Sequence, residues 1–206
     1  IRDNSGADHS SVGTIGAGVD YFLLDKALEL FGEVAGQFGD ENENDAHSGF
    51  GLDIGARWTF KELGSIKGLY VELNLGYRSG DDTTDADDSA FDNAWAKRTG
   101  ALIAENNLND DSPMYKGYAS SSYMAVRIET GASWTEKLSS HLLIGIFDNT
   151  TEDADPYGVE VDLCTIYKYS ENLMMGIHIG AFMPDDGLAI DGDTVFALAL
   201  ETAVTF

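Results

Sequence analysis

The strongest constraint on the fold of this polypeptide comes from the end of the chain, Asp193–Phe206. Every second residue from Phe196 to Phe206 is apolar or Thr, while the residues between them are mostly small or polar. A period of two indicates a β-strand, because successive side chains of a strand point to opposite faces. The stretch is roughly twice as long as an ordinary globular strand. Such a length is typical of a tilted strand that crosses a membrane.

The same alternation predicts eight more strands upstream. They are expected at Ser11–Leu24, Leu28–Gly39, Ser48–Phe60, Gly68–Ser79, Tyr123–Trp134, His141–Phe147, Tyr157–Tyr169 and Leu173–Met183. His141–Phe147 is expected to be the shortest, and all the connections are compatible with antiparallel hairpins. The sequence therefore predicts one all-β domain, residues 1–206, with nine antiparallel strands.

Charge and composition exclude several classes of protein. The chain has 12 basic and 36 acidic residues, and this net charge of −24 argues against a nucleic-acid partner, whose phosphates bind Lys and Arg. No run of 18 apolar residues is present, so no transmembrane helix is expected. A single cysteine, Cys164, excludes a disulfide within the chain. The chain begins Ile-Arg-Asp-Asn without a signal peptide, as a mature protein or a fragment would.

A soluble β-sandwich also alternates apolar and polar faces, so three further features are needed to favour a membrane barrel. The strands are long. The connections after residues 24, 60, 135 and 169 are short, whereas those after 39, 79, 147 and 183 are longer and acidic. Aromatic residues gather near both ends of the strands. These features predict a transmembrane antiparallel β-barrel in the lipid of a bacterial outer membrane, with the acidic loops extracellular and the C-terminus periplasmic.

Counting strand directions back from Phe206 gives a further expectation. If Phe206 ends at the periplasm, Ser11–Leu24 runs from the outside towards the periplasm. An even-stranded bacterial barrel begins with a strand in the other direction. Either one strand is miscounted or an odd number of strands precedes residue 1. We favour the second, in which these residues form the C-terminal half of a larger barrel of roughly eighteen strands.

The last fifty residues or so also resemble a known family. PYGVEVDLCTIYKYSENLMMGIHIGAFMPDDG (156–187), followed by DTVFALALETAVTF (193–206), is similar to the C-terminal end of the alginate-export family of outer-membrane porins. In that family, a strand with the pattern G-x-E-x-D-L-x-x-x-Y-K leads through a short polar turn to a strand ending in F-x-P-G/D-D. Residues 28–40 and 68–82 resemble earlier strands of the family. The resemblance implies a monomeric eighteen-stranded barrel that passes a polysaccharide or another solute through the outer membrane.

The polar face of the strands provides the predicted pore lining. Its basic members are Arg57, Arg78, Arg127 and Lys168; its other members are His178 and the acids Asp20, Glu29, Glu33, Asp53, Glu72, Glu129, Glu160, Asp162 and Glu201. This excess of carboxylates does not suit a polyanionic substrate such as alginate, because lumen charge sets selectivity. The basic residues either contact solute or pair with acidic neighbours, as Arg127 with Glu129 or Lys168 with Glu160, and we favour the pairing.

The acidic loops raise the question of a metal ion. Asp81, Asp82, Asp85, Asp87 and Asp88 supply carboxylates of the kind that Ca²⁺ binds. They do not follow the EF-hand pattern, so we favour a solvated acidic loop over a weak Ca²⁺ site and expect no other cofactor. The segment 80–122 that contains them has no strand periodicity and is far longer than an ordinary connection. It either folds into the lumen as a constriction or forms a long extracellular loop.

No pattern in the chain favours catalysis. His141 and His178 have no Ser–His–acid spacing or metal cluster around them, and Cys164 is interpreted as a small residue of the pore wall. The prediction is therefore a channel for passage or export of a polar solute, and not an enzyme. The alternative is a structural or interaction barrel that sheathes or binds a protein partner in its lumen or at its loops.

Overall fold

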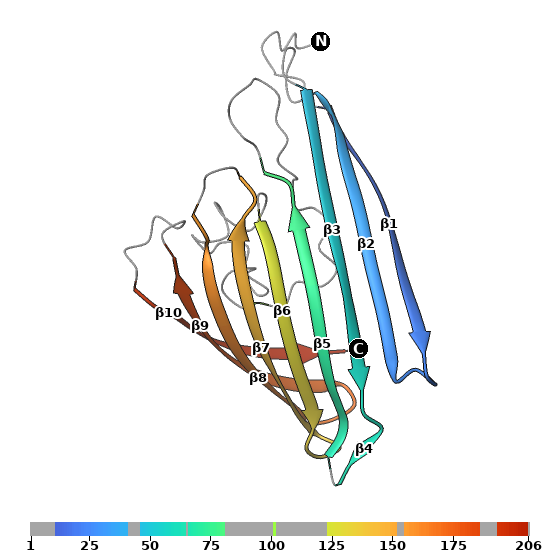
Figure 1. The fold of residues 1–206 in the computed structure, drawn as a ribbon. Helices are drawn as coiled ribbons and strands as arrows, with labels where there is room; N and C mark the ends of the chain where they lie inside the picture. Colours follow the sequence, from blue (N-terminus) through green and yellow to red (C-terminus); the bar gives the residue numbers. More distant parts are fainter. Residues whose placement is uncertain are drawn as a thin grey trace, which may run out of the picture.

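The structure is a computed structural model that describes residues 11–40, 46–64, 66–80, 101, 123–151, 155–185 and 193–205. They form one antiparallel sheet (Figure 1). Its strands are β1 (Ser11–Leu23), β2 (Leu28–Asp40), β3 (Ala46–Thr59), β4 (Glu62–Leu63), β5 (Ile66–Arg78), β6 (Tyr123–Ser133), β7 (Leu138–Asn149), β8 (Gly158–Lys168), β9 (Leu173–Pro184) and β10 (Val195–Val204). The predicted all-β antiparallel fold with nine long strands is confirmed.

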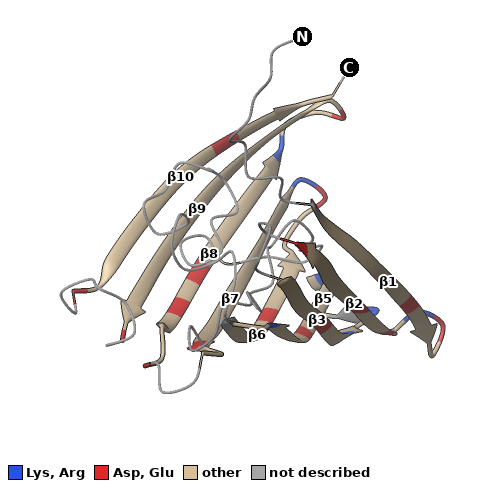
Figure 2. Ribbon diagram, turned by 90° about the horizontal axis from the view of Figure 1, so that it is seen from above, with Lys and Arg blue, Asp and Glu red and all other residues tan. Residues whose placement is uncertain are grey.

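The sheet has a simple order. Each long strand pairs with the next one along the chain, from β1 to β10, and the two-residue β4 pairs with β5 only. Seen from above, the sheet curves into a trough whose two rims are β1 and β10 (Figure 2). Within the described residues, these two strands have a neighbour on one side only, so the sheet is open. Because every pairing is antiparallel and there are nine long strands, β1 and β10 run in the same direction.

The two faces of the sheet differ in chemistry and in burial. The apolar face carries large side chains that remain open to the surroundings; Ile128, Leu198 and Leu200, for example, are 50%, 69% and 77% exposed. The other face, here called the charged face, contains the predicted charged residues and is mostly buried; Arg78 is 1% and Glu160 0% exposed. This is the reverse of a water-soluble sheet, in which the apolar face is covered and the polar face is wet.

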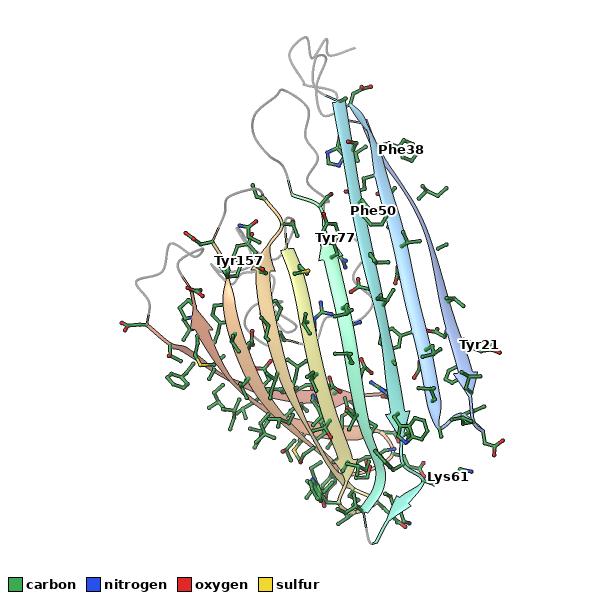
Figure 3. The ribbon with its side chains drawn as sticks, viewed as in Figure 1. Tyr21, Phe38, Phe50, Lys61, Tyr77 and Tyr157 are labelled. Atoms are coloured by element: carbon green, nitrogen blue, oxygen red, sulfur yellow. The ribbon has the colours of Figure 1, made fainter. Side chains whose placement is uncertain are left out.

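Aromatic side chains occur towards both ends of the strands. Phe38, Phe50 and Tyr77 lie near the ends of β2, β3 and β5 that face the longer connections, and Tyr21 lies near the opposite end (Figure 3). The rings of Phe50 and Tyr77 are 6.3 Å apart, and those of Trp58 and Phe60, at the short-turn end, are 6.4 Å apart. Phe206, the aromatic residue at the end of the last predicted strand, lies outside the described residues. The aromatic residues thus form two bands, with aliphatic side chains between them.

Two strand predictions need correction. β7 spans 12 residues, Leu138–Asn149, and is not the short strand that was expected at 141–147. Its ends carry residue types that favour turns. Ser139 and Ser140 nevertheless pair with both β6 and β8, and Asp148 and Asn149 pair with β6. The connection after Phe60 also contains β4, which the sequence did not indicate.

All regular secondary structure in the described residues is β-strand. None of the described residues belongs to a helix with the length and apolar character needed to cross a membrane.

Candidate functional site on the charged face

The predicted residues of the charged face differ in how deeply they are buried. The buried side chains are those of Asp53, Glu72, Arg78, Arg127, Glu160 and Asp162. Partly exposed members are Glu29, Glu33, Arg57, Glu129, His178 and Glu201, whereas Asp20 near the end of β1 and Lys168 at the end of β8 are exposed. The acidic run with Asp81, Asp82, Asp85, Asp87 and Asp88 lies outside the described residues. The buried members therefore concentrate on β3, β5, β6 and β8.

Asp53 is the centre of the first group. Nη2 of Arg78 lies 2.5 Å from Oδ2 of Asp53, and Nη1 of Arg127 lies 3.8 Å from its Oδ1. Arg127 also donates to the amide oxygen of Asn74, its register partner on β5. One carboxylate thus lies between two guanidinium groups that reach it from two different strands. Buried charges need such partners, because an unpaired buried charge is costly.

A second group lies nearer the short turns. Nε of Arg57 on β3 donates to Oε2 of Glu72 on β5 at 2.6 Å, and these residues are register partners. The guanidinium of Arg57 also lies over the ring of Tyr70, 4.4 Å from its centroid, in a cation–π contact. The Tyr70 hydroxyl donates to Glu129 on β6. These contacts join three strands through side chains as well as through backbone hydrogen bonds.

The ring of Tyr70 fits here because β6 has a glycine opposite it. A Cβ atom at Gly131 would lie 2.6 Å from Cε1 of Tyr70, closer than real Cβ contacts allow. Gly131 therefore provides the space that lets Tyr70 lie across the sheet and reach Glu129. Tyr70 and Asn74 were not among the predicted site residues. Their alternation with Glu72 along β5 was the signal that could have identified them.

The predicted pairing with an acidic residue on an adjacent strand is found for Arg57 and Arg78, whereas the adjacent-strand partner of Arg127 is the neutral Asn74. The partners differ from the proposed examples: the contacts found for Arg127 are with Asn74 and Asp53, and Lys168 is exposed at the end of β8. Charges that neutralise each other in this way fix the register of β3, β5 and β6. The side chains of Arg78 and Arg127 are buried in these contacts, whereas that of Arg57 is 33% exposed.

On β8, β9 and β10 the charged face has a different character. Cys164 is buried, and its Sγ lies 3.8 Å from Nε2 of His178, its register partner on β9. The same Nε2 lies 3.1 Å from Oε2 of Glu201 on β10. The sequence interpretation placed all three on the polar face but did not bring them together. The short turn between β8 and β9 was the available signal, because Cys164 and His178 are equidistant from it.

Nearer the longer connections, the same face carries an apolar cluster. Ala125, Leu143, Phe147, Tyr157 and Phe182 are buried together, and Val195, Ala197 and Ala199 of β10 pack against them. Phe147 and Phe182 reach across β8 with their ring centroids 6.5 Å apart. Ala101, from the segment 80–122, belongs to this cluster and is fully buried. At Ala101 the chain therefore lies on the charged side of the sheet.

Within the described residues, no group of three or more His, Cys, Asp or Glu side chains could hold a metal ion. Comparisons with protein-family models and with curated proteins find no match for this chain. The function is therefore inferred from the geometry of the two faces.

Proposed function

We propose that this chain forms part of the wall of a bacterial outer-membrane β-barrel channel, with its apolar face in lipid and its charged face lining a polar lumen. The observation that carries this proposal is the reversed burial of the two faces. Large apolar side chains are exposed over the whole apolar face, whereas Asp53, Arg78 and Glu160 are buried. Contiguous exposed apolar surface of this extent is rare in soluble monomers and is ordinary in lipid.

The alternative of a soluble sandwich requires a second layer on the apolar face. In the described residues, every long strand belongs to one sheet, and the exposed apolar side chains include members of each of the nine. Strands of 10 to 14 residues and aromatic bands near both ends also suit a bilayer, whose interfaces favour Trp and Tyr.

The open edges of β1 and β10 bear on the size of the barrel. A strand edge in hydrocarbon leaves backbone N–H and C=O groups without partners, so a membrane sheet has to close. We propose that further strands complete the barrel, in agreement with the resemblance to the alginate-export family. That resemblance, and the barrel of about eighteen strands that it implies, remain part of this proposal.

The solute proposed for the channel is polar and is not a polyanion. Arg57, Arg78 and Arg127 are each held by a partner on a neighbouring strand. The carboxylates of the charged face outnumber its basic groups, and fixed charges in a lumen select ions of the opposite sign. We therefore propose that the lumen favours cations and neutral polar solutes over alginate-like anions.

The test is a measurement of ion conductance. The full-length protein, refolded in detergent and added to a planar lipid bilayer, is expected to give discrete conductance steps. A potassium chloride gradient is expected to yield a larger permeability for K⁺ than for Cl⁻. A protein that stays folded and monodisperse without detergent and forms no pores would contradict the channel. Pores that prefer Cl⁻ would contradict only the proposed solute.

One observation favours the second candidate, a barrel that binds or sheathes a polypeptide. Ala101 is buried among Leu143, Phe147 and Phe182, so an apolar part of the charged face already accepts chain from outside the sheet. A protein partner in the lumen would be expected to use the same kind of contact. Pull-down of a defined partner that protects these residues, together with absence of conductance, would favour this candidate.

A further inference from the structure

We infer that Glu33 on β2 and Glu129 on β6 determine the ion selectivity of the channel proposed above. Both carboxylates are on the charged face and partly exposed. Among the described residues, neither forms an ion pair with a basic side chain. This role rests on the proposed channel, and it specifies which of the surplus carboxylates a permeating ion meets.

The strand register places carboxylates directly opposite each other at two positions. Glu33 is the register partner of Asp53 on β3, and Glu129 is the register partner of Glu72 on β5. Like charges directly opposite each other in an antiparallel pair are destabilising. Local arrangements that oppose stability are expected where a function requires them. The two facing pairs are therefore the positions of the charged face at which a functional role is most strongly indicated.

In each facing pair, an arginine neutralises the buried member. Asp53 is buried, and its Oδ2 lies 2.5 Å from Nη2 of Arg78. Glu72 is also buried, and its Oε2 lies 2.6 Å from Nε of Arg57. The other member of each pair is partly exposed. The buried negative charge is thus balanced in place, whereas the accessible one remains for the lumen.

The surroundings of Glu33 support this assignment. Its register partners are Gly18 on β1 and Asp53 on β3, and the next positions of β3 on the same face are Gly51 and Gly55. A Cβ atom at Gly18 would lie 3.8 Å from Cβ and Cγ of Glu33, so the glutamate lies against a position without a side chain. None of these four positions carries a basic side chain that could neutralise it.

Glu129 is held by a neutral donor. It accepts a hydrogen bond from the Tyr70 hydroxyl, and its register partner on β7 is Leu143. An ionised carboxylate can only accept hydrogen bonds, and a neutral hydroxyl orients it without cancelling its charge. Glu129 therefore presents a negative charge of fixed position on the wall.

The expected effect of one such charge is measurable. At about 6 Å in water, a unit charge changes the local concentration of a monovalent ion by about threefold, and added salt reduces this effect. The Arg57–Glu72 and Arg78–Asp53 pairs bring charges of both signs to almost the same point, so they contribute far less to the field in the lumen.

Reversal potentials in a potassium chloride gradient test this role. The full-length protein in planar bilayers is compared with Glu33→Gln and Glu129→Gln. Each change is expected to lower the permeability ratio of K⁺ to Cl⁻ by about threefold, and the double variant is expected to lower it further. Glu33→Lys is expected to lower the ratio more than Glu33→Gln, and it retains the fold because the new charge lies opposite Asp53.

Two glutamates in short turns provide the matched control. Glu136 and Glu171 are exposed outside the strands, so Glu136→Gln combined with Glu171→Gln removes the same net charge and is expected to leave the ratio unchanged. An unchanged ratio in either single variant of the charged face, or equal losses in the two double variants, would overturn the inference while the channel stands. Absence of conductance from the unchanged protein would overturn both. Circular dichroism of each variant separates altered selectivity from loss of the sheet.

Discussion

The apolar and charged faces of the sheet are made by the same strands but are stabilised in different ways. On the apolar face, side chains such as those of Ile144 and Ile177 have no polar group that needs a hydrogen-bond partner, and they remain exposed. On the charged face, Asp53, Arg78 and Arg127 are buried and depend on specific partners. The charged face thus fixes the register of the strands, while the apolar face determines the medium in which the sheet is stable.

The largest effect is expected from Asp53→Ala. The change leaves Arg78, and in part Arg127, as buried charges without their carboxylate, so the free energy of unfolding is expected to fall by about 3 to 5 kcal/mol. Urea unfolding in detergent micelles measures it. Glu33 on β2 is the register partner of Asp53 but is partly exposed, so Glu33→Ala serves as control, with a loss below about 1 kcal/mol. Equal losses would show that burial does not distinguish these carboxylates.

A somewhat smaller effect is expected from Ile144→Lys on the apolar face. A lysine near the middle of a lipid-facing strand destabilises a membrane barrel by about 2 to 4 kcal/mol. The measurement is the folding free energy in lipid vesicles. In water, the same change at this exposed position would cost only about 0.5 kcal/mol or less. A small effect would therefore place the apolar face in water and contradict its proposed contact with lipid.

Leu142 and Leu143 compare the two faces with the same residue type at adjacent positions. Leu143 is 2% exposed in the apolar cluster, whereas Leu142 is 38% exposed on the apolar face. Leu143→Ala leaves a cavity among packed side chains and is expected to cost about 2 to 3 kcal/mol. Leu142→Ala is expected to cost below about 1 kcal/mol, because lipid or detergent tails fill the space. Unfolding in detergent measures both, and a reversed order would contradict the assignment of the faces.

The smallest effect is expected from Tyr70→Phe. The change removes the hydroxyl that donates to Glu129 but keeps the ring over Gly131 and beneath Arg57. Loss of a hydrogen bond to a charged group is expected to cost about 1.5 kcal/mol of unfolding free energy. Tyr77→Phe on the apolar face is the control, with an expected change below about 0.5 kcal/mol. A larger loss in Tyr77→Phe would indicate that its hydroxyl has a structural role.

The alternation of side chains was sufficient to predict most of the sheet. Strands such as β3 and β10 carry mostly apolar residues at every second position, so their type, face and approximate ends follow from a period of two. β7 was predicted too short because Ser139 and Ser140 at its start resemble a turn. Their neighbours on β6 and β8 supply the hydrogen bonds that keep them in the sheet, and this tertiary effect is invisible along the chain.

The candidate site was predictable in composition but not in pairing. Alternation placed Arg127 and Asp53 on one face, but their contact spans two strand pairings whose registers the sequence does not specify. Cys164 and His178 were closer to prediction, because one short turn sets their register. The burial of Ala101 was not predictable, since nothing near it in the sequence has the period of a strand.

The shared direction of β1 and β10 has a consequence for self-assembly. Rotation about an axis parallel to the strands leaves their direction unchanged, so copies of this sheet arranged in a ring would place β10 of one copy parallel to β1 of the next. Each such seam would interrupt an otherwise antiparallel ladder with a less stable pairing. Identical subunits related by such an axis therefore do not make a uniformly antiparallel wall, and an antiparallel closure between β10 and β1 calls for an odd number of further strands.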